Sequence, residues 1–295
     1  MPYALTLLHS QLIASIPYPT SSFANQTIIV TGSNTGLGLE ASRHLVRLGA
    51  KVILAVRTPS KGQAAANDIL ESCKNASADR VEVWQLDMGN HDSIKAFAKR
   101  AATLQRLDAV ALNAGVLSSN WSEINGVESH IAINVIGTVL LELLLLPILQ
   151  RSAKSTGQRG RMTIVGSDLM YTASPESLQT SGSILNKLNT KGEIDIGTYY
   201  SLSKLLVFYA NRRIASEYLV SGKSEVIITV MTPGACVSDI FRDEKTFFER
   251  IGMIVGMKLI GRTTEVGGRT LVNCILPEIE SEAHGKFLMD CLVTE

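Results

Sequence analysis

Short runs of apolar residues alternate along the chain with longer segments in which apolar residues recur every three to four positions. The first pattern is typical of buried strands, and the second of helices that bury one face. The short runs predict seven strands, at Thr27–Thr31, Lys51–Val56, Val81–Leu86, Asp108–Leu112, Arg161–Val165, Val226–Met231 and Lys286–Met289. The periodic segments predict helices at Gly36–Leu48, Ser60–Cys73, His91–Leu104, Gly126–Gln150 and Thr198–Val220.

The predicted strands are continuously apolar rather than alternating, and this pattern indicates burial on both faces of a parallel sheet. Because β–α–β crossovers are right-handed, repeated alternation of strands and helices predicts a doubly wound α/β sheet, the Rossmann fold. No internal repeat or linker divides the sequence. We therefore expect an N-terminal extension at 1–24 and one domain at 25–295, with a small substrate-side lobe and lid at 168–198 and 238–262.

Composition restricts the classes of function. Hydrophobic residues make up 45% of the 295 residues and charged residues 19%, with a net charge of +1. This balance argues against disorder and against a general attraction for nucleic acid. The four cysteines are scattered without a C-x-x-C pair, so we expect no metal site and no disulfides. A reducing compartment, the cytoplasm, fits this cysteine usage.

Two strongly apolar segments raise the question of membrane contact. The segment 3–16 lacks the basic region of a signal peptide and is too short to span a bilayer. It can form an amphipathic helix on a membrane or on the body of the protein, and we favour the body. The run Val139–Leu149 is shorter than a span and contains Glu142 and Pro147, which favours a helix in the core or at a subunit interface.

The first predicted strand and helix enclose a glycine turn. Gly32, Gly36 and Gly38 form the pattern G-x-x-x-G-x-G directly after the strand. Small residues let the main chain approach a pyrophosphate, and the N–H groups and dipole of the new helix favour the anion. The turn therefore indicates a dinucleotide site, and a glycine-bearing turn without a ligand is the alternative.

Other distinctive residues follow the predicted strands. Doubly wound sheets bind their ligands at the carboxyl ends of the strands. Besides Gly32, the residues expected at this edge are Arg57, Asp87, Asn113, Ser167 and Pro233. The sequence therefore predicts the site at this edge.

Tyr200 and Lys204 lie four residues apart in a predicted helix, so they share one face. A lysine ammonium near a phenol lowers the pKa of the phenol, which can then exchange a proton with a substrate oxygen near neutral pH. Ser167 can hold a carbonyl oxygen against Tyr200, and Asn134 can hold a water chain that runs from Lys204 to solvent. The alternatives are a chance Y-x-x-x-K pair and an asparagine that only packs or caps.

Seven motifs occur in the order and spacing of one family. They are TGSNTGLG at 31–38, LD at 86–87, NAG at 113–115, NVIG at 134–137, GS at 166–167, YSLSK at 200–204 and PG at 233–234. Over roughly residues 25–240 the chain resembles the short-chain dehydrogenase/reductase family. TGSNTGLG, AVR at 55–57 and the long gap before Y-x-x-x-K look most like its retinol-dehydrogenase-like branch, including fungal members.

The resemblance implies a role for each residue of the site. Tyr200 is implied to be the general acid in reduction and the base in oxidation, and Lys204 to lower its pKa and bind the nicotinamide ribose. Ser167 is implied to position the substrate oxygen, and Asn134 to complete the tetrad through a relay water. The further residues implied at the nucleotide are Gly32, Ser33, Asn34, Gly36, Leu37, Gly38, Asp87, Asn113, Pro233, Val237 and Ser238.

The end of the second predicted strand indicates which nucleotide binds. An acidic residue there would accept a hydrogen bond from the ribose 2′-hydroxyl of NAD and repel a 2′-phosphate. This chain instead has Arg57, with Lys61 close by. A guanidinium suits a phosphate, so the sequence predicts NADP(H) bound through Arg57 and Lys61. A solvated surface arginine is the alternative.

Two segments are expected beside the substrate. Tyr200 follows Ser167 by 33 positions, and the largely polar sequence between them predicts an added lobe. The segment 240–262 combines aromatic residues with an apolar run, which predicts either a lid over an apolar substrate or an ordinary packed helix. The candidates to line the lid are Phe241, Phe247, Phe248, Ile251 and Met253.

Together these features predict an NADP(H)-dependent oxidoreductase that interconverts a carbonyl and an alcohol on an apolar small molecule. The fungal resemblance implies a ketoreductase of secondary metabolism. The family resemblance implies a homodimer or homotetramer formed through the helices at 126–150 and 198–220, and a monomer kept soluble by the N-terminal segment is the alternative. The alternatives are a non-redox isomerase or cyclase that keeps the nucleotide structurally, and a nucleotide-sensing protein without turnover.

Overall fold

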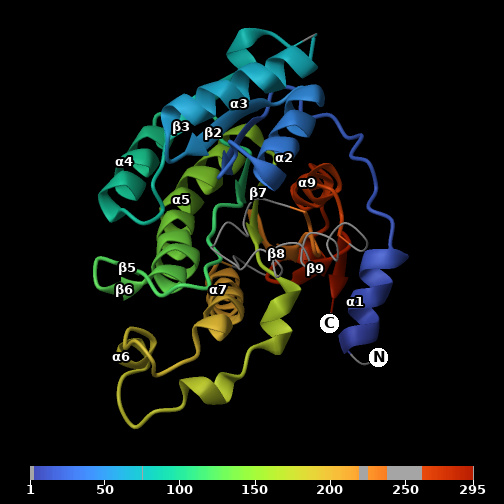
Figure 1. Ribbon diagram of the computed structural model, residues 1–295. Helices are drawn as coiled ribbons and strands as arrows, with labels where there is room; N and C mark the ends of the chain where they lie inside the picture. The colour runs from blue at the N-terminus through green and yellow to red at the C-terminus, as the bar shows by residue number, and fades with distance from the viewer. Residues whose placement is uncertain (1–2, 75, 219–224, 238–260, 295) are drawn as a thin grey trace.

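The computed structural model describes residues 3–74, 76–218, 225–237 and 261–294 (Figure 1). Its central sheet has eight strands in the order β10-β9-β8-β7-β4-β1-β2-β3. All neighbouring strands are parallel except the terminal pair β9 and β10. The strands are β1 (Thr27–Thr31), β2 (Lys51–Val56), β3 (Val81–Gln85), β4 (Ala109–Leu112), β7 (Gly160–Val165), β8 (Val226–Thr232), β9 (Phe287–Met289) and β10 (Leu292–Thr294).

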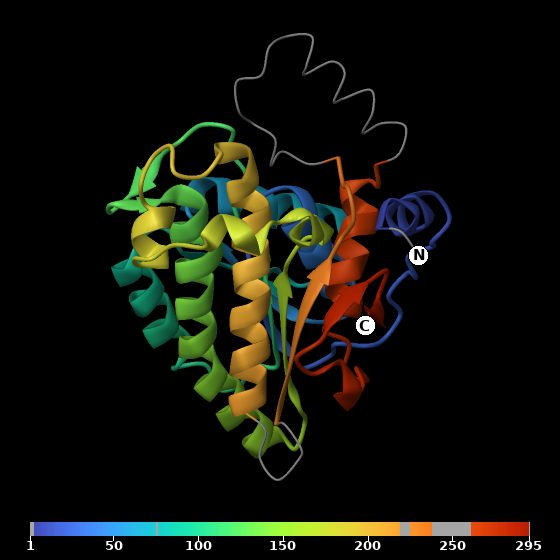
Figure 2. The same ribbon diagram turned by 90° about the horizontal axis from the view of Figure 1, so that it is seen from below.

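Helices cover both faces of the sheet (Figures 1 and 2). One layer consists of α2 (Gly36–Arg47), α3 (Pro59–Ser72) and α9 (Thr264–Asn273), and the other of α4 (His91–Ala101), α5 (Thr138–Thr156) and α7 (Ile196–Glu217). Each layer closes its own hydrophobic core against the sheet. The strand residues are almost all buried, as their continuous apolar runs predict, and the doubly wound α/β fold is confirmed.

The order of the strands locates a crevice. From β1 the chain proceeds outward to β2 and β3, and it then returns to β4, on the other side of β1. The helices that follow β1 and β4 therefore leave the sheet toward opposite faces. The carboxyl ends of these two strands flank the switch point at which doubly wound sheets hold nucleotides.

The segment before α5 differs from the expectation. The helix predicted from Gly126 begins instead at Ile131, with a π-helical stretch η2 (Ile131–Gly137) that continues into α5. Residues 123–128 form a hairpin of β5 (Glu123–Ile124) and β6 (Val127–Glu128). The reason is local, because Asn125 and Gly126 have φ values of 53° and 76°, and Asn-Gly favours such tight hairpin turns.

The apolar run in α5 is part of the core. The continuous helical segment 131–156 is long and apolar enough to cross a membrane by length and composition. Leu141, Leu145 and Leu149 are nevertheless wholly buried inside the fold, in the core against the sheet. Burial of this face agrees with the prediction of a core helix.

The N-terminal helix α1 (Tyr3–Leu12) lies beside the carboxyl-terminal strands (Figure 1). The Ser10 hydroxyl donates to Asp290 at 2.8 Å, and the Arg262 guanidinium donates to the Ser10 carbonyl at 2.7 Å. These contacts attach α1 to the body of the protein, which is the arrangement we favoured from the sequence.

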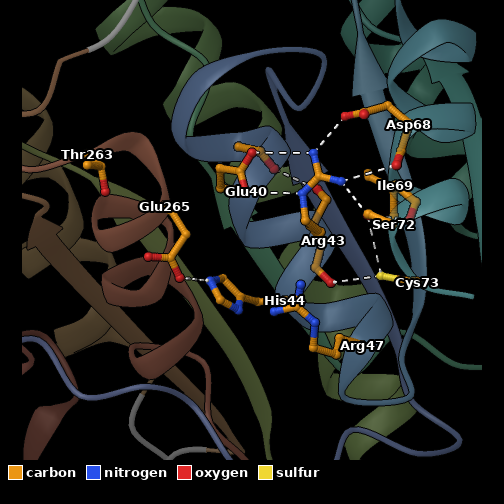
Figure 3. Close-up of polar contacts among 12 residues, drawn as sticks. Glu40, Arg43, His44, Arg47, Asp68, Ile69, Ser72, Cys73, Thr263 and Glu265 are labelled. Carbon is orange, nitrogen blue, oxygen red and sulfur yellow. Dashed lines mark hydrogen bonds and ion pairs between the residues drawn. The ribbon is translucent and has the colours of Figure 1, made fainter.

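Ion pairs join the helices on the α2 side of the sheet (Figure 3). Arg43 of α2 contacts Glu40 at 3.1 Å and Asp68 of α3 at 2.6 Å. His44, buried on the same helix, lies 2.9 Å from Glu265 of α9. These contacts cross-link α2, which carries the glycine turn at its start, to both of its neighbours.

Candidate active site

A cavity of about 390 Å³ opens at the carboxyl ends of β1, β2, β3 and β4. It lies at the switch point of the sheet, and residues that follow each of these four strands line it. The residues expected from the sequence that line it are Gly32, Asn34, Gly36, Leu37, Arg57, Lys61, Asp87 and Asn113. The structure also contributes Thr35, Thr58, Met88 and Ile133, which the sequence did not identify.

The glycine turn has room for backbone only. Gly32 has a φ of 63°, which favours glycine. A Cβ at Gly38 would lie 2.6 Å from the side-chain nitrogen of Asn113 and 2.7 Å from the carbonyl oxygen of Gly32. Ser33 beside them has a buried hydroxyl without a hydrogen-bond partner in the described part of the chain. A close-packed turn with a spare buried donor, at the start of α2, fits a dinucleotide pyrophosphate.

Asn113 holds the ends of the two central strands together. Its side-chain nitrogen donates to the carbonyl of Thr31 at 2.9 Å and to that of Gly32 at 3.2 Å. In return, the Thr31 hydroxyl accepts from the backbone N–H groups of Asn113 and Ala114, both at 2.9 Å. Sequence reasoning identified Asn113 but missed Thr31, whose only signal was a hydroxyl as the last residue of a buried strand.

The far end of the cavity is charged. Arg57 and Lys61 are both exposed there, at the end of β2 and the start of α3. Asp87, after β3, is partly buried and accepts from the backbone N–H of Gly89 at 3.0 Å. Two cations and one carboxylate therefore surround this part of the cavity.

Tyr200 and Ser167 come together from different elements. Tyr200 lies in the second turn of α7, and Ser167 follows β7, where it accepts from the backbone N–H of Leu169 at 3.2 Å. The Ser167 hydroxyl lies close enough to the Tyr200 phenol to lower the pKa of that phenol. Lys204, one turn further along α7, donates to the carbonyl of Val165 at 2.7 Å, and its ammonium lies 5.5 Å from the centre of the Tyr200 ring.

The proton affinities of this pair differ from the expectation. Burial raises the pKa of Tyr200 to about 12, assisted by the charge of Asp168 and opposed by the Ser167 hydroxyl. Burial lowers the pKa of Lys204 to about 8. Desolvation disfavours the charged form of both groups, and the ammonium is directed to a carbonyl rather than toward a phenolate. The phenol is therefore a protonated donor at neutral pH in this structure.

Asn134 connects the cavity loop to α7, the helix that carries Tyr200 and Lys204. It lies in η2, where its side chain donates to the carbonyl of Val116 at 2.9 Å and accepts from the N–H of Val116 at 2.8 Å. It also donates to the Ser203 hydroxyl at 3.0 Å. A Cβ on Gly115 would lie 3.1 Å from the Asn134 carbonyl oxygen and 3.6 Å from the Lys204 ammonium. The cavity loop thus passes directly beside both polar groups.

The remaining candidates lie away from the cavity lining or outside the described residues. Pro233 follows β8, and its carbonyl accepts from Arg262 at 3.1 Å. The backbone N–H of Val237 donates to the Arg262 carbonyl at 2.9 Å. Ser238 and the lid candidates Phe241, Phe247, Phe248, Ile251 and Met253 lie outside the described residues.

The predicted lobe between Ser167 and α7 consists of short helices. They are η3 (Asp168–Thr172), η4 (Pro175–Leu178) and α6 (Ile184–Leu188). Figure 2 shows this segment in yellow-green and yellow in front of the α5 and α7 layer. Leu169 and Tyr171, just after Ser167, are 41% and 48% exposed, so apolar surface is available next to the Tyr200–Ser167 pair.

Comparison with known proteins identifies the family. A family model described as short chain dehydrogenase matches residues 26–177, about half of the chain. The chain belongs to the short-chain dehydrogenase family. It is 39% identical to the short chain dehydrogenase/reductase dmxR8 of Cryptosporiopsis sp., over 96% of this chain and 87% of that protein. It is 38% identical to the short-chain dehydrogenase anuD of Penicillium roqueforti, over 99% of this chain and 76% of that protein.

Solved structures agree on the fold of this short-chain dehydrogenase. A 3-ketoacyl-(acyl-carrier-protein) reductase from Brucella melitensis, solved in complex with NADH, superposes with a TM-score of 0.63. The match covers 90% of this chain and 97% of that one at 17% identity. The protein is thus a fungal-type oxidoreductase of the family, whose fold binds a nicotinamide nucleotide and whose substrates are small molecules.

Proposed function

We propose that this short-chain dehydrogenase is an NADP(H)-dependent carbonyl reductase that acts on an apolar small molecule in fungal secondary metabolism. The single observation that carries the proposal is the placement of Tyr200 and Lys204 one turn apart on α7, with the Lys204 ammonium 5.5 Å from the Tyr200 ring and beside Gly115 of the cavity loop. The fungal relatives support the metabolic setting. The exposed Leu169 and Tyr171 after Ser167 support an apolar substrate.

Arg57 and Lys61 support the choice of NADP(H). Both line the cavity at the end of β2, where a Rossmann fold receives the adenine ribose. Neither side chain can accept a hydrogen bond from a ribose 2′-hydroxyl, and both attract a 2′-phosphate.

In the proposed mechanism, NADPH would be held by the glycine turn at Gly32–Gly38 and by Arg57 and Lys61, and it would supply the hydride that reduces the carbonyl carbon of the substrate. Ser167 donates a hydrogen bond to the carbonyl oxygen and holds it near the phenol. Tyr200 transfers its proton to that oxygen as negative charge develops there, so an alcohol forms. Lys204, whose pKa is about 8, returns a proton to Tyr200, and Asn134 lies beside the ammonium on the path to the loop.

Substitution of Arg57 tests the nucleotide preference. We expect Arg57→Asp to lower the ratio of kcat/KM for NADPH to that for NADH by about a hundredfold, because a carboxylate repels the 2′-phosphate and accepts from the 2′-hydroxyl. The assay is the loss of NADPH or NADH absorbance with a panel of apolar ketones and aldehydes. Arg213→Asp, at an exposed arginine of α7, is the matched control and should leave the ratio unchanged. An unchanged ratio in Arg57→Asp would reject the assignment.

A further inference from the structure

A buried glutamate and histidine lie together beneath the loop that follows β4. Glu128, at the end of β6, and His130 are both fully buried. One carboxylate oxygen accepts from the backbone N–H groups of His130 at 2.8 Å and Ile131 at 3.1 Å. The other faces His130 Nδ1 at 2.8 Å and accepts from the Ser129 hydroxyl at 3.1 Å. Glu128 therefore caps the start of the helical segment that carries Asn134.

The partners of His130 determine its tautomer. Its Nε2 lies 3.0 Å from the backbone nitrogen of Ser118, and a peptide N–H can only donate. Nε2 must therefore be the unprotonated acceptor. The ring proton then resides on Nδ1 and is donated to Glu128, because an imidazole holds at least one proton. The Ser118 N–H therefore donates to His130, and His130 in turn donates to Glu128.

These hydrogen bonds attach the Glu128–His130 pair to the loop that lines the cavity. Ser118 directly follows the cavity-lining part of the loop after β4, residues 113–117. Thr31 holds the start of this part, Asn134 holds its middle at Val116, and His130 holds its far end at Ser118. The imidazole also lies between two tyrosines, with ring centres 6.4 Å from Tyr199 in a stacked arrangement and 6.4 Å from Tyr200 edge to face.

We propose that Glu128 and His130 are positioning residues for the reduction. The pair holds the far end of the cavity loop and one side of the Tyr200 ring in a fixed relation, so that the phenol faces the carbonyl. Neither side chain contacts the reacting atoms in this account. The proposal rests on the proposed function, and it assigns a positioning role to two residues outside the Y-x-x-x-K motif.

Kinetics of His130→Gln test the proposal. A glutamine can accept the hydrogen bond from the Ser118 N–H. It removes the imidazole ring that packs against Tyr199 and Tyr200, and it removes the hydrogen bond to Glu128. We expect kcat to fall by about tenfold or more, because small misplacements of reacting groups are costly. The Kd for NADPH, measured by fluorescence titration, should change by less than about threefold, since Thr31 holds the nucleotide end of the loop. The pH profile of kcat should also shift, because the surroundings of the Tyr200 phenol change.

Glu128→Gln is the second variant. The carboxylate receives donors on both oxygens, so an amide in either orientation places a donor against a donor. We expect the same separation of kcat from NADPH affinity. His284→Gln is the matched control, because His284 also accepts a backbone N–H, that of Ile228 at 3.2 Å, but bridges α7 and β8 away from the cavity. It should lower thermal stability and leave kcat within about twofold.

Two kinetic outcomes would overturn the proposal. One is a kcat within about twofold of the wild type in His130→Gln. The other is a parallel loss of kcat, NADPH affinity and folded fraction, which marks a purely structural role.

Imidazole ¹⁵N NMR of the full-length protein gives a readout that needs no substrate. The Nδ1–H tautomer of His130 in the wild type supports the proposal. An Nε2–H tautomer or an imidazolium overturns it. Wild-type protein that reduces none of the ketones or aldehydes would reject the proposed function, and the NMR result would still decide the arrangement of the pair.

Discussion

At the carboxyl ends of β1 and β4, main-chain groups, the Thr31 hydroxyl and the Asn113 side-chain amide hold the strand ends in place, and none of them titrates. On the α5 and α7 side, by contrast, the polar groups are ionisable side chains with strongly shifted pKa values, including Tyr200, Lys204 and Glu142. In the proposed function, the first region binds an anion through backbone dipoles that cannot titrate. The second region moves a proton in the proposed reaction, so it needs groups whose proton affinity the fold can change. Substitutions should therefore separate nucleotide binding from proton transfer.

The largest expected effect is that of Tyr200→Phe. Removal of the hydroxyl deletes the proton donor while keeping the ring, so we expect kcat to fall by about a thousandfold. NADPH affinity, measured by fluorescence titration, should stay close to that of the wild type if the two regions are separable. Tyr209→Phe, at a half-exposed tyrosine further along α7, is the control and should retain full turnover. Substantial activity in Tyr200→Phe would disprove the assignment of the donor.

The next effect concerns Glu142, a fully buried carboxyl on α5 beside Asn211 of α7. Burial raises its pKa from 4.5 to about 8, so the folded state keeps a proton that the unfolded chain releases. The free energy of unfolding should therefore fall as pH rises from about 4.5 to 8, by up to about 1.4 kcal/mol per pH unit. Neither carboxyl oxygen of Glu142 has a hydrogen-bond partner among the described residues, so nothing there offsets the cost of burying the charge.

Glu142→Gln keeps the size and polarity of the side chain and removes the titration. Urea denaturation at pH 5, 6.5 and 8 should show a variant that gains stability relative to the wild type as pH rises, by about 3 kcal/mol at pH 8. Glu217→Gln, at an exposed glutamate paired with Arg213, is the control for a general charge effect. Equal pH dependence in Glu142→Gln and the wild type would contradict a neutral buried carboxyl.

A smaller effect is expected at Thr31. Thr31→Val keeps the shape of the side chain but leaves the N–H groups of Asn113 and Ala114 without their acceptor. We expect the free energy of unfolding to fall by about 2 kcal/mol and NADPH affinity to weaken, with kcat at saturating nucleotide largely retained. Thr229→Val, which removes a buried hydroxyl pair between β7 and β8, should affect stability alone. A loss of kcat without a loss of affinity would show that the two regions are not separable.

Local sequence was sufficient for the nucleotide half of the site. The strand, glycine turn and helix at 27–47 follow from apolar runs and from backbone chemistry that acts between close neighbours. The same reasoning failed at Gly126, where helical periodicity was followed although Asn125 and Gly126 indicate a hairpin turn. It also missed Glu128 and His130, because their importance depends on Ser118 and Tyr200 lying against them.

The amino-acid sequence by itself determined the parallel sheet, the family and the residues that can hold a nucleotide or carry a proton. Their spacing is a property of the chain, and short-range geometry converts it directly into structure. Only the tertiary structure decided that Tyr200 holds its proton, that Lys204 bonds the Val165 carbonyl, and that Glu142 is desolvated. Proton affinity depends on the solvent excluded by segments far apart in sequence, and no local pattern records that burial.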